Sequence, residues 1–381
     1  MQARLFQAIR RVAGRGRVSV MHPAREKIKA QALTCSWCLL TGRLRKMLHS
    51  AQSPSHLQTP PPRRNRQPGP LNRSAPLPLH AAFPRVTLDW AFDRYEALRA
   101  RLPQARFVAD PLQVADLSAV FDRFDGFVLD AFGVLNVGET AIEGAVARIA
   151  RMRAAGKRVV VLTNGASYPR RQALAKYARL GFDFNSDEVV ASRDLAATTL
   201  EGRGGLWAAI TAPGAAFDDL PARVEPLDAD PALLRHADGF LFLGSEGWTP
   251  ARQHALQAAL RESPRPVIVA NPDIVAPRED GLTLEPGHFA HDLPGFGTSL
   301  APQFYGKPFG GALDAAIARL GDLPRHRIAM VGDTLHTDVL GGRAAGVGTV
   351  LIAAHGLFRG LDPAPYITRA GISPDVIATT T

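Results

Sequence analysis

Three short apolar runs of strand type each end in a side chain that can take part in chemistry. These side chains are Asp130, Thr163 and Asp333, and Lys307 opens a predicted helix between the last two of them. Ligands of open α/β sheets bind outside the carboxyl ends of parallel strands. The four groups are therefore expected to converge at one edge of a sheet.

The residue types in this set suit phosphate and a hard metal ion. Convergent carboxylates without His or Cys, here Asp130, Asp333 and Asp338, favour Mg²⁺. A hydroxyl at Thr163 and an ammonium at Lys307 favour a phosphate, as do free N–H groups beside glycine. Asp130 is then a candidate nucleophile for phosphoryl transfer. Singly, each residue also has a structural explanation as a cap, a turn residue or a solvated charge.

The elements that must position these groups alternate between strand and helix. Strands separated by single helices predict βαβ units and a parallel sheet, so the expected fold is α/β with a Rossmann-like parallel-sheet core. The predicted helices are Ile142–Ala155, Arg170–Leu180, 306–320 and Gly341–Ala345, and the predicted strands are Phe127–Asp130, Arg158–Leu162, Ile328–Val331 and Thr349–Ile352.

A second α/β block interrupts this alternation and predicts an inserted cap domain over residues 187–296. It is large enough for a small core of its own. Its predicted strands are Leu206–Thr211, Gly239–Leu243 and Val267–Ala270, its helices are Pro231–His236 and Pro250–Glu262, and its exit loops are 271–273 and 284–298. The core domain is thus expected in two parts, 85–186 and 297–381.

Residues 1–84 are expected to be a disordered, basic, Pro-rich tail. Residues 1–88 hold sixteen of the 45 Lys and Arg but only one acid, Glu26, so the remainder has a net charge of −5. The pI therefore supports no nucleic-acid partner. A transit peptide, a basic arm and a misassigned start all remain open for this segment. The pair Cys35 and Cys38 has no second Cys pair to complete a zinc site.

The chain has no apolar run of the ~20 residues that a membrane span requires, so a soluble, cytoplasmic protein is expected. The first helix after the tail is predicted over 88–102, with Asp89 as its cap.

The sequence resembles the haloacid dehalogenase superfamily, and within it the class IIA phosphatase-like members, over about residues 113–357. The resemblance consists of four motifs in order with an insertion between the second and third. They are Leu129-Asp130-Ala131-Phe132-Gly133-Val134-Leu135, Leu162-Thr163-Asn164-Gly165, Gly306-Lys307-Pro308 and Val331-Gly332-Asp333-Thr334-Leu335-His336-Thr337-Asp338.

The resemblance implies a role for each matched residue. Asp130 would be the nucleophile and, with Asp333, Asp338 and the backbone carbonyl of Phe132, would hold Mg²⁺. Thr163, Asn164, Gly165 and Lys307 would bind the phosphate, with Lys307 neutralising its charge. The resemblance also implies a small phosphorylated substrate and homodimers that pair through the cap.

Phe132 departs from the family pattern, which has a second Asp there as general acid and base. General acid–base catalysis contributes about 10²–10⁴ in rate, so activity would be reduced or altered. Two alternatives stay open beside a Mg²⁺-dependent phosphatase. One is a metal-independent dehalogenase-like hydrolase, and the other is a phospho-ligand-binding protein with little turnover.

For other polar and aromatic residues near the motifs or in the cap, the sequence gives weaker evidence of a functional role. Asn136, Glu139 and His336 could provide a proton route, but the sequence favours surface or turn positions for them. In the cap, residues that could meet substrate are Trp248, Asn271, Asp273 and His288.

Overall fold

The computed structural model describes residues 86–107 and 110–381. The predicted tail over 1–84 and the pair Cys35 and Cys38 lie outside the described residues. Among the described residues, no helix combines the length and hydrophobicity that crossing a membrane requires.

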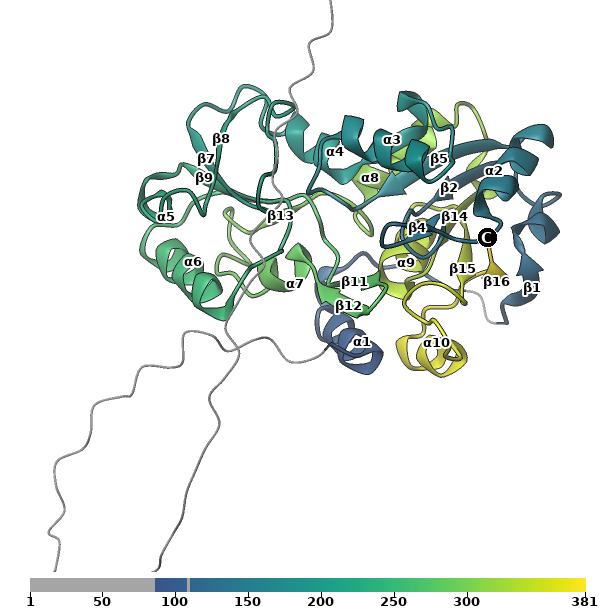
Figure 1. Ribbon diagram of the computed structural model, residues 1–381. Coiled ribbons are helices and arrows are strands. Elements are labelled where there is room, and N and C mark those ends of the chain that lie inside the picture. Colours follow the sequence, from purple (N-terminus) through teal and green to yellow (C-terminus); the bar gives the residue numbers. More distant parts are fainter. Residues whose placement is uncertain (1–85, 108–109) are drawn as a thin grey trace, which may run out of the picture. The chain divides into compact units, whose positions relative to one another are not determined.

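A seven-stranded, all-parallel sheet forms the core of the fold (Figure 1). We call it the core sheet. In spatial order its strands are β1 (Leu112–Asp116), β16 (Val376–Thr380), β15 (Gly348–Ile352), β14 (Ile328–Gly332), β2 (Gly126–Leu129), β5 (Arg158–Thr163) and β6 (Val189–Ala191). Its helices are α2 (Ala145–Ala154), α3 (Arg170–Arg179), α4 (Ser192–Thr198), α8 (Gly310–Arg319), α9 (Leu340–Ala344) and α10 (Ala364–Ala370).

A second parallel sheet is inserted between α4 and α8, and we call it the cap sheet. Its strands in spatial order are β13 (Gln303–Phe304), β10 (Val267–Val269), β9 (Gly239–Phe242), β7 (Leu206–Ile210) and β8 (Arg223–Pro226). Its helices are α5 (Leu233–His236), α6 (Pro250–Glu262) and α7 (Pro286–Ala290). The predicted fold class, a Rossmann-like core with an inserted α/β cap, is confirmed.

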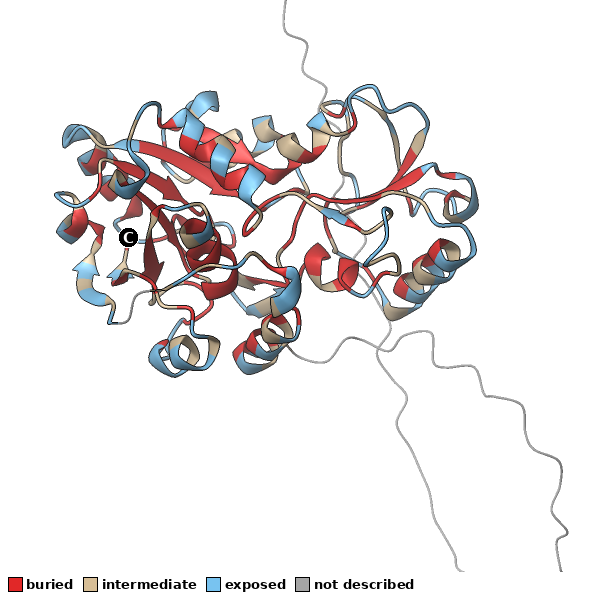
Figure 2. Cartoon of the chain, turned by 180° about the vertical axis from the view of Figure 1, so that it is seen from behind, coloured by how far each residue is buried: buried red, intermediate tan, exposed pale blue. Residues whose placement is uncertain are grey.

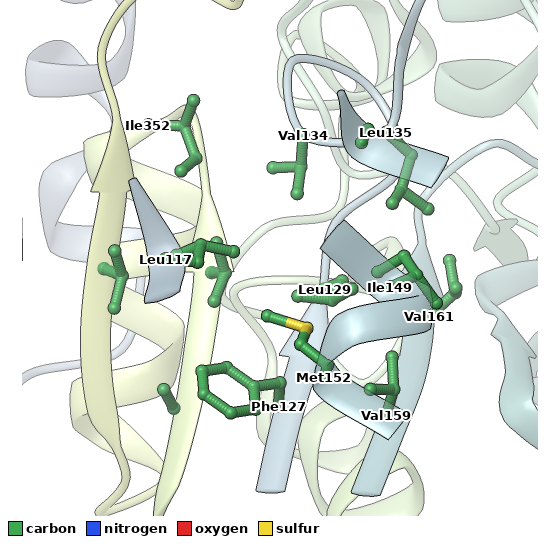
Figure 3. Close-up of a cluster of buried hydrophobic side chains, with 14 of the residues drawn as sticks. Leu117, Phe127, Leu129, Val134, Leu135, Ile149, Met152, Val159, Val161 and Ile352 are labelled. Atoms are coloured by element: carbon green, nitrogen blue, oxygen red, sulfur yellow. The ribbon is translucent and has the colours of Figure 1, made fainter. Parts of the chain in front are cut away.

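The core sheet is buried on both faces at its centre, where β2 and β14 carry only apolar residues and glycine. Phe127 and Leu129 face one side, where they join Ile149 and Met152 of α2 in one hydrophobic cluster (Figure 3). Val128, between them, joins a second cluster on the other side with α8. This alternation follows from the two-residue period of a strand, and Figure 2 shows the central strands of the core sheet as buried.

The expected elements differ from the structure in three places. The first helix, α1 (Leu88–Ala97), is capped by Thr87, whose hydroxyl accepts from Trp90 N, and not by Asp89, which lies in the first turn. The stretch expected as a plain exit loop contains α7 and the end of a hairpin formed by β11 (Val275–Arg278) and β12 (Gly281–Leu284). A small hairpin of β3 (Asn136–Val137) and β4 (Thr140–Ala141) was not expected.

The domain limits at residues 187 and 296 stay predictions. By strand pairing alone, β6 belongs to the core sheet, since it pairs with β5. Strand β13 pairs with β10 of the cap sheet. The chain therefore changes sheets after α4 and again after β13.

Candidate active site

The polar side chains predicted to converge do meet at the carboxyl ends of the core strands. Asp130 follows β2 directly, Asp333 follows β14, and Thr163 is the last residue of β5. Asp338 lies in the π-helical turn after β14. Lys307 lies between β13 and α8. We call Asp130, Lys307, Asp333 and Asp338 together the site floor.

A buried lysine joins two of the carboxylates in the site floor. Lys307 Nζ is 2.6 Å from Asp130 Oδ1 and 2.7 Å from Asp338 Oδ1. Only 1% of Lys307 is exposed. Burial acts to lower the pKa of Lys307, but the charges of Asp130 and Asp338 outweigh it and raise that pKa above its usual range. The lysine therefore stays a cation in the site.

The three carboxylates of the site floor fit a hard metal ion. Oxygen atoms of Asp130, Asp333 and Asp338 all lie within 4.8 Å of one another. Burial, and then repulsion from Asp338, raises the pKa of Asp130 to about 6, despite Lys307, and that of Asp333 to about 8. Asp338 Oδ1 is buried, and Lys307 Nζ is its ion-pair partner. Oxygen-only ligands crowded in this way suit Mg²⁺, which would neutralise their repulsion.

Hydrogen bonds hold the acidic side chains of the floor in place. Asp333 Oδ2 accepts from Leu357 N at 2.7 Å, and Asp338 Oδ2 accepts from Thr334 N at 3.0 Å. Gly133, at φ +76°, leaves room for this arrangement, because a Cβ there would stand 2.7 Å from the carboxylate of Asp333. The glycine of the first motif is thus a packing requirement of the site.

Three of the four residues predicted to bind phosphate, Thr163, Asn164 and Gly165, line a cavity of about 20 Å³ that Asp130 and Asp333 also line, whereas Lys307 does not line it. Thr163 Oγ1 accepts from Gly165 N at 3.0 Å. The side chain of Asn164 is fully engaged: Nδ2 donates to Asp273 Oδ1 and to the Lys307 carbonyl, and Oδ1 accepts from Lys307 N. Any contact of Asn164 with phosphate would have to come from its backbone.

A larger cavity, of about 470 Å³, shares Phe132, Thr163, Gly165 and Asp273 with the small one. The ring of Phe132 borders it, with Lys176 Nζ 4.9 Å and Arg278 Cζ 5.0 Å from the ring centroid. We call Phe132, Lys176 and Arg278 the site wall. A separate hollow of about 300 Å³ beside α1 and the β11–β12 hairpin contains none of the floor residues.

Two of the four cap residues singled out in the sequence reach the site. Asn271 and Asp273 line the larger cavity, and Asp273 N donates to Asn271 Oδ1 in a tight turn. Burial raises the pKa of Asp273 well above its usual range. Trp248 is buried in the cap core, where its indole N–H donates to Gln253. His288 packs against Trp90 of α1 and is not among the residues that line either site cavity.

Two of the three possible proton-route residues, for which surface or turn positions were expected, are buried. Asn136 is fully buried and its amide donates to Gly138 O. His336 is 1% exposed. Glu139 is exposed as expected and is paired with Lys176. The hydrophobic surroundings of Asn136 and His336 come from distant segments, which local sequence does not reveal.

Helix α1 contacts two segments of the site. Tyr95 stacks on His336 with ring centroids 4.8 Å apart, and Glu96 Oε1 is 2.5 Å from His336 Nε2. The Tyr95 hydroxyl accepts from Ile274 N at 3.2 Å, one residue beyond Asp273. A single helix thus contacts both the fourth motif and the turn that carries Asp273.

Sequence reasoning missed Lys176, Arg278 and Tyr95. Lys176 is one of many basic residues on the exposed side of a helix, and Arg278 precedes a hairpin turn that was not expected. Neither position carries a local signal for a site, because Lys176 on α3 and Arg278 on β11 meet Phe132 only in the folded chain.

Comparisons with known proteins agree with this geometry. The model of haloacid dehalogenase-like hydrolases matches residues 127–216, and a model of HAD-hydrolase-like proteins matches residues 304–375. The two segments contain the strands, the acids and the lysine of the site floor.

Several of the similar proteins are phosphatases by name. The chain is 27% identical over 264 residues to phosphoglycolate phosphatase 1A, chloroplastic, of Arabidopsis thaliana, covering 63% of this chain and 71% of that protein. It is 27% identical over 241 residues to an acid sugar phosphatase of Staphylococcus haemolyticus, covering 60% and 84%. A possible sugar phosphatase structure from Cytophaga hutchinsonii superimposes with a TM-score of 0.63 at 25% identity, covering 71% and 98%.

Proposed function

Because the chain belongs to the haloacid dehalogenase superfamily, as a class IIA phosphatase-like hydrolase, we propose that it cleaves small phosphate monoesters through Asp130 with Mg²⁺. Its relatives are phosphohydrolases of small phosphorylated metabolites. They favour a phosphatase over the dehalogenase and the non-catalytic alternatives.

The observation that carries the proposal is the position of Lys307 between Asp130 and Asp338. The ammonium holds one oxygen of Asp130 in place and offsets negative charge that develops on a phosphoryl group beside it. Thr163 and the backbone near Gly165 would hold that group from the other side of the shared cavity.

Mg²⁺, when bound by Asp130, Asp333, Asp338 and the Phe132 carbonyl, would neutralise charge on the phosphoryl oxygens. In the proposed reaction an Asp130 carboxylate oxygen attacks phosphorus, the P–O bond to the alcohol breaks, and the alcohol oxygen takes up a proton. Water then cleaves the aspartyl phosphate and releases inorganic phosphate.

Asp273 is the proposed source of the proton that the family obtains from an acid at position 132. It lines both cavities, and its burial favours the protonated form that can donate. Asn164 fixes its orientation by donating to Oδ1 at 2.8 Å.

The experiment is a screen of phosphorylated metabolites and 2-haloacids, with Mg²⁺ and with EDTA. We expect Mg²⁺-dependent phosphate release, and acid-quenched mixtures should contain a peptide with a phosphoryl group on Asp130. Halide release that persists in EDTA would overturn the proposal. The cytoplasmic location and the homodimer stay predictions.

A further inference from the structure

We propose that Lys176 and Arg278, held against the ring of Phe132, bind a carboxylate of the substrate, so that the protein prefers phosphate esters whose alcohol part is an acid. This inference rests on the proposed function, which places the phosphoryl group at Asp130.

The two cations and the phosphoryl site share one cavity. Lys176 comes from α3 and Arg278 from β11, yet both lie about 5 Å from the centre of the Phe132 ring, within cation–π range. Both line the 470 Å³ cavity, together with Thr163 and Gly165. A volume of this size accommodates a small metabolite. A substrate bound at Thr163 would thus extend toward two positive charges.

Both cations are held in place before any ligand arrives. Lys176 Nζ donates to Gly138 O at 2.8 Å and to Glu139 at 2.7 Å. Arg278 donates from Nη2 to Glu285 and from Nε to Thr283. Within the described residues, Nη1 of Arg278 has no protein partner and keeps its hydrogens for a ligand. Fixed donors of this kind lose little conformational entropy on binding.

Three acids lie near the two cations without taking up all their donors. Glu139 is 71% exposed at its side chain, so water screens its attraction for Lys176. Glu279 is also exposed. Glu285 is buried, and burial raises its pKa although Arg278 opposes this shift. A substrate carboxylate would therefore bind beside these acids through the donor that Arg278 keeps, Nη1, in a charge-assisted hydrogen bond.

Phe132 explains why the cations remain available. An acid at this position would lie near Lys176 and Arg278, which are each about 5 Å from the centre of the Phe132 ring, and could pair with them. The aromatic ring attracts both through its π face but carries no charge, so it leaves their charge to the substrate. At position 132 the family pattern has an Asp that transfers protons. In this chain Phe132 instead leaves the neighbouring cations free to select the substrate.

The test compares two esters, 2-phosphoglycolate and ethyl phosphate, which differ by a carboxylate. With Mg²⁺, the wild type should show a kcat/KM at least tenfold higher for 2-phosphoglycolate. Arg278→Met and Lys176→Met should each bring that ratio toward one, mainly by raising KM for 2-phosphoglycolate. Arg171→Met is the matched control, because this arginine lies on the same helix as Lys176, pairs with Asp218 outside the cavity, and should keep the wild-type ratio.

The outcomes separate this inference from the proposed function. Equal kcat/KM for the two esters in the wild type, or ratios unchanged in both Met variants, would overturn the carboxylate subsite and leave the phosphatase intact. No phosphate release from either ester, or from any ester in the screen, would overturn the proposed function and the subsite with it. Thermal melting identifies a variant that fails to fold, and the two variants lie on separate elements.

Discussion

The site floor and the site wall are built in opposite ways. The floor places Asp130, Lys307 and Asp338 in contact, almost completely buried, at the edge of the core sheet where β2 and β14 end. The wall brings together a loop residue, a helix residue and a hairpin residue, and its side chains are partly exposed. The wall can therefore change residue by residue without disturbing the sheet. The difference indicates that the floor fixes the reaction and the wall selects the substrate.

The largest expected effect tests whether the floor fixes the reaction. Asp130→Asn keeps the volume of the side chain but removes the nucleophile and one metal ligand. We expect phosphate release to fall by at least about 10³-fold, while the circular dichroism spectrum stays that of the wild type. Asp314→Asn, which removes an exposed partner of Arg325, is the control and should keep full activity. Wild-type kcat in Asp130→Asn would end the proposed mechanism.

The second prediction tests how strongly the stability of the protein depends on the ion pairs of Lys307 in the floor. Lys307→Met leaves the buried carboxylates of Asp130 and Asp338 without their cation. Breaking a buried pair in this way costs about 3–5 kcal/mol. Urea denaturation should show this loss, and Mg²⁺ should restore part of it.

Lys157→Met is the control for this experiment. Lys157 pairs with Asp125 nearer the surface, at the opposite end of the core strands. We expect a loss of no more than about 1 kcal/mol and no response to Mg²⁺. Equal losses in the two variants would mean that the floor is not the tightly coupled part of the molecule.

The first two predictions concern the site floor, most of which can be predicted from the sequence. Asp130, Thr163 and Asp333 could be placed together because strand ends in a parallel sheet share an edge. Their neighbours along the chain, apolar runs and glycines, fix the local structure. Lys307 can be assigned to the site only through the family resemblance and through its position at the start of a predicted helix.

The wall could not be predicted, since it depends on contacts between segments far apart in the sequence. Lys176 meets Phe132 through the packing of α3 on the core, and Arg278 meets it through the packing of the β11–β12 hairpin. For the same reason, the hydrogen bond from Ile274 N to the Tyr95 hydroxyl cannot be predicted from the sequence. Local propensity and periodicity carry no information on such contacts.

The third prediction changes the wall toward the family pattern. Phe132→Asp places a carboxylate beside Lys176 and Arg278 and near the leaving oxygen. We expect hydrolysis of ethyl phosphate to rise by about 10²-fold, the low end of what an acid–base group contributes, and the preference for 2-phosphoglycolate to fall. The measurement is kcat/KM for both esters in a variant that melts cooperatively. An unchanged preference would show that the ring does not keep the cations free.

The fourth prediction uses pH to compare the floor with and without metal. Without metal, burial raises the pKa of Asp333 to about 8, above its unfolded value of 3.8. The folded protein then binds more protons than the unfolded chain in this window. This contribution to stability is present below pH 3.8 and is lost as pH rises through about 8.

The measurement is the free energy of unfolding between pH 6.5 and 8 in EDTA. The buried histidines His288 and His291, whose pKa values burial lowers, titrate alike in the wild type and in Asp333→Asn, so their contribution cancels in the comparison. The wild type should lose up to about 1.4 kcal/mol per pH unit relative to Asp333→Asn. Mg²⁺ should flatten the difference, because it requires the charged carboxylate. Parallel curves in EDTA would contradict the raised pKa.

The smallest effect is expected at the helix that joins the two regions. Tyr95→Phe keeps the stack on His336 but removes the oxygen that accepts from Ile274 N. A buried donor left without a partner costs about 1–3 kcal/mol. Because Ile274 follows Asp273 directly, the turn that carries the proposed proton donor should also become less fixed, and kcat should fall a few-fold with KM unchanged.

Tyr366→Phe separates this positioning role from a general loss of stability. It also removes a tyrosine hydroxyl that bonds to α1, but at the exposed Asp89, away from the Asp273 turn. We expect its kcat to equal that of the wild type and its stability to change by no more than about 0.5 kcal/mol. If Tyr95 affects activity only through stability, Tyr95→Phe and the wild type will have the same kcat per folded molecule. Each is measured at a urea concentration that gives the same folded fraction. A lower kcat per folded molecule, found only in Tyr95→Phe, would show that α1 positions the acid that serves the floor.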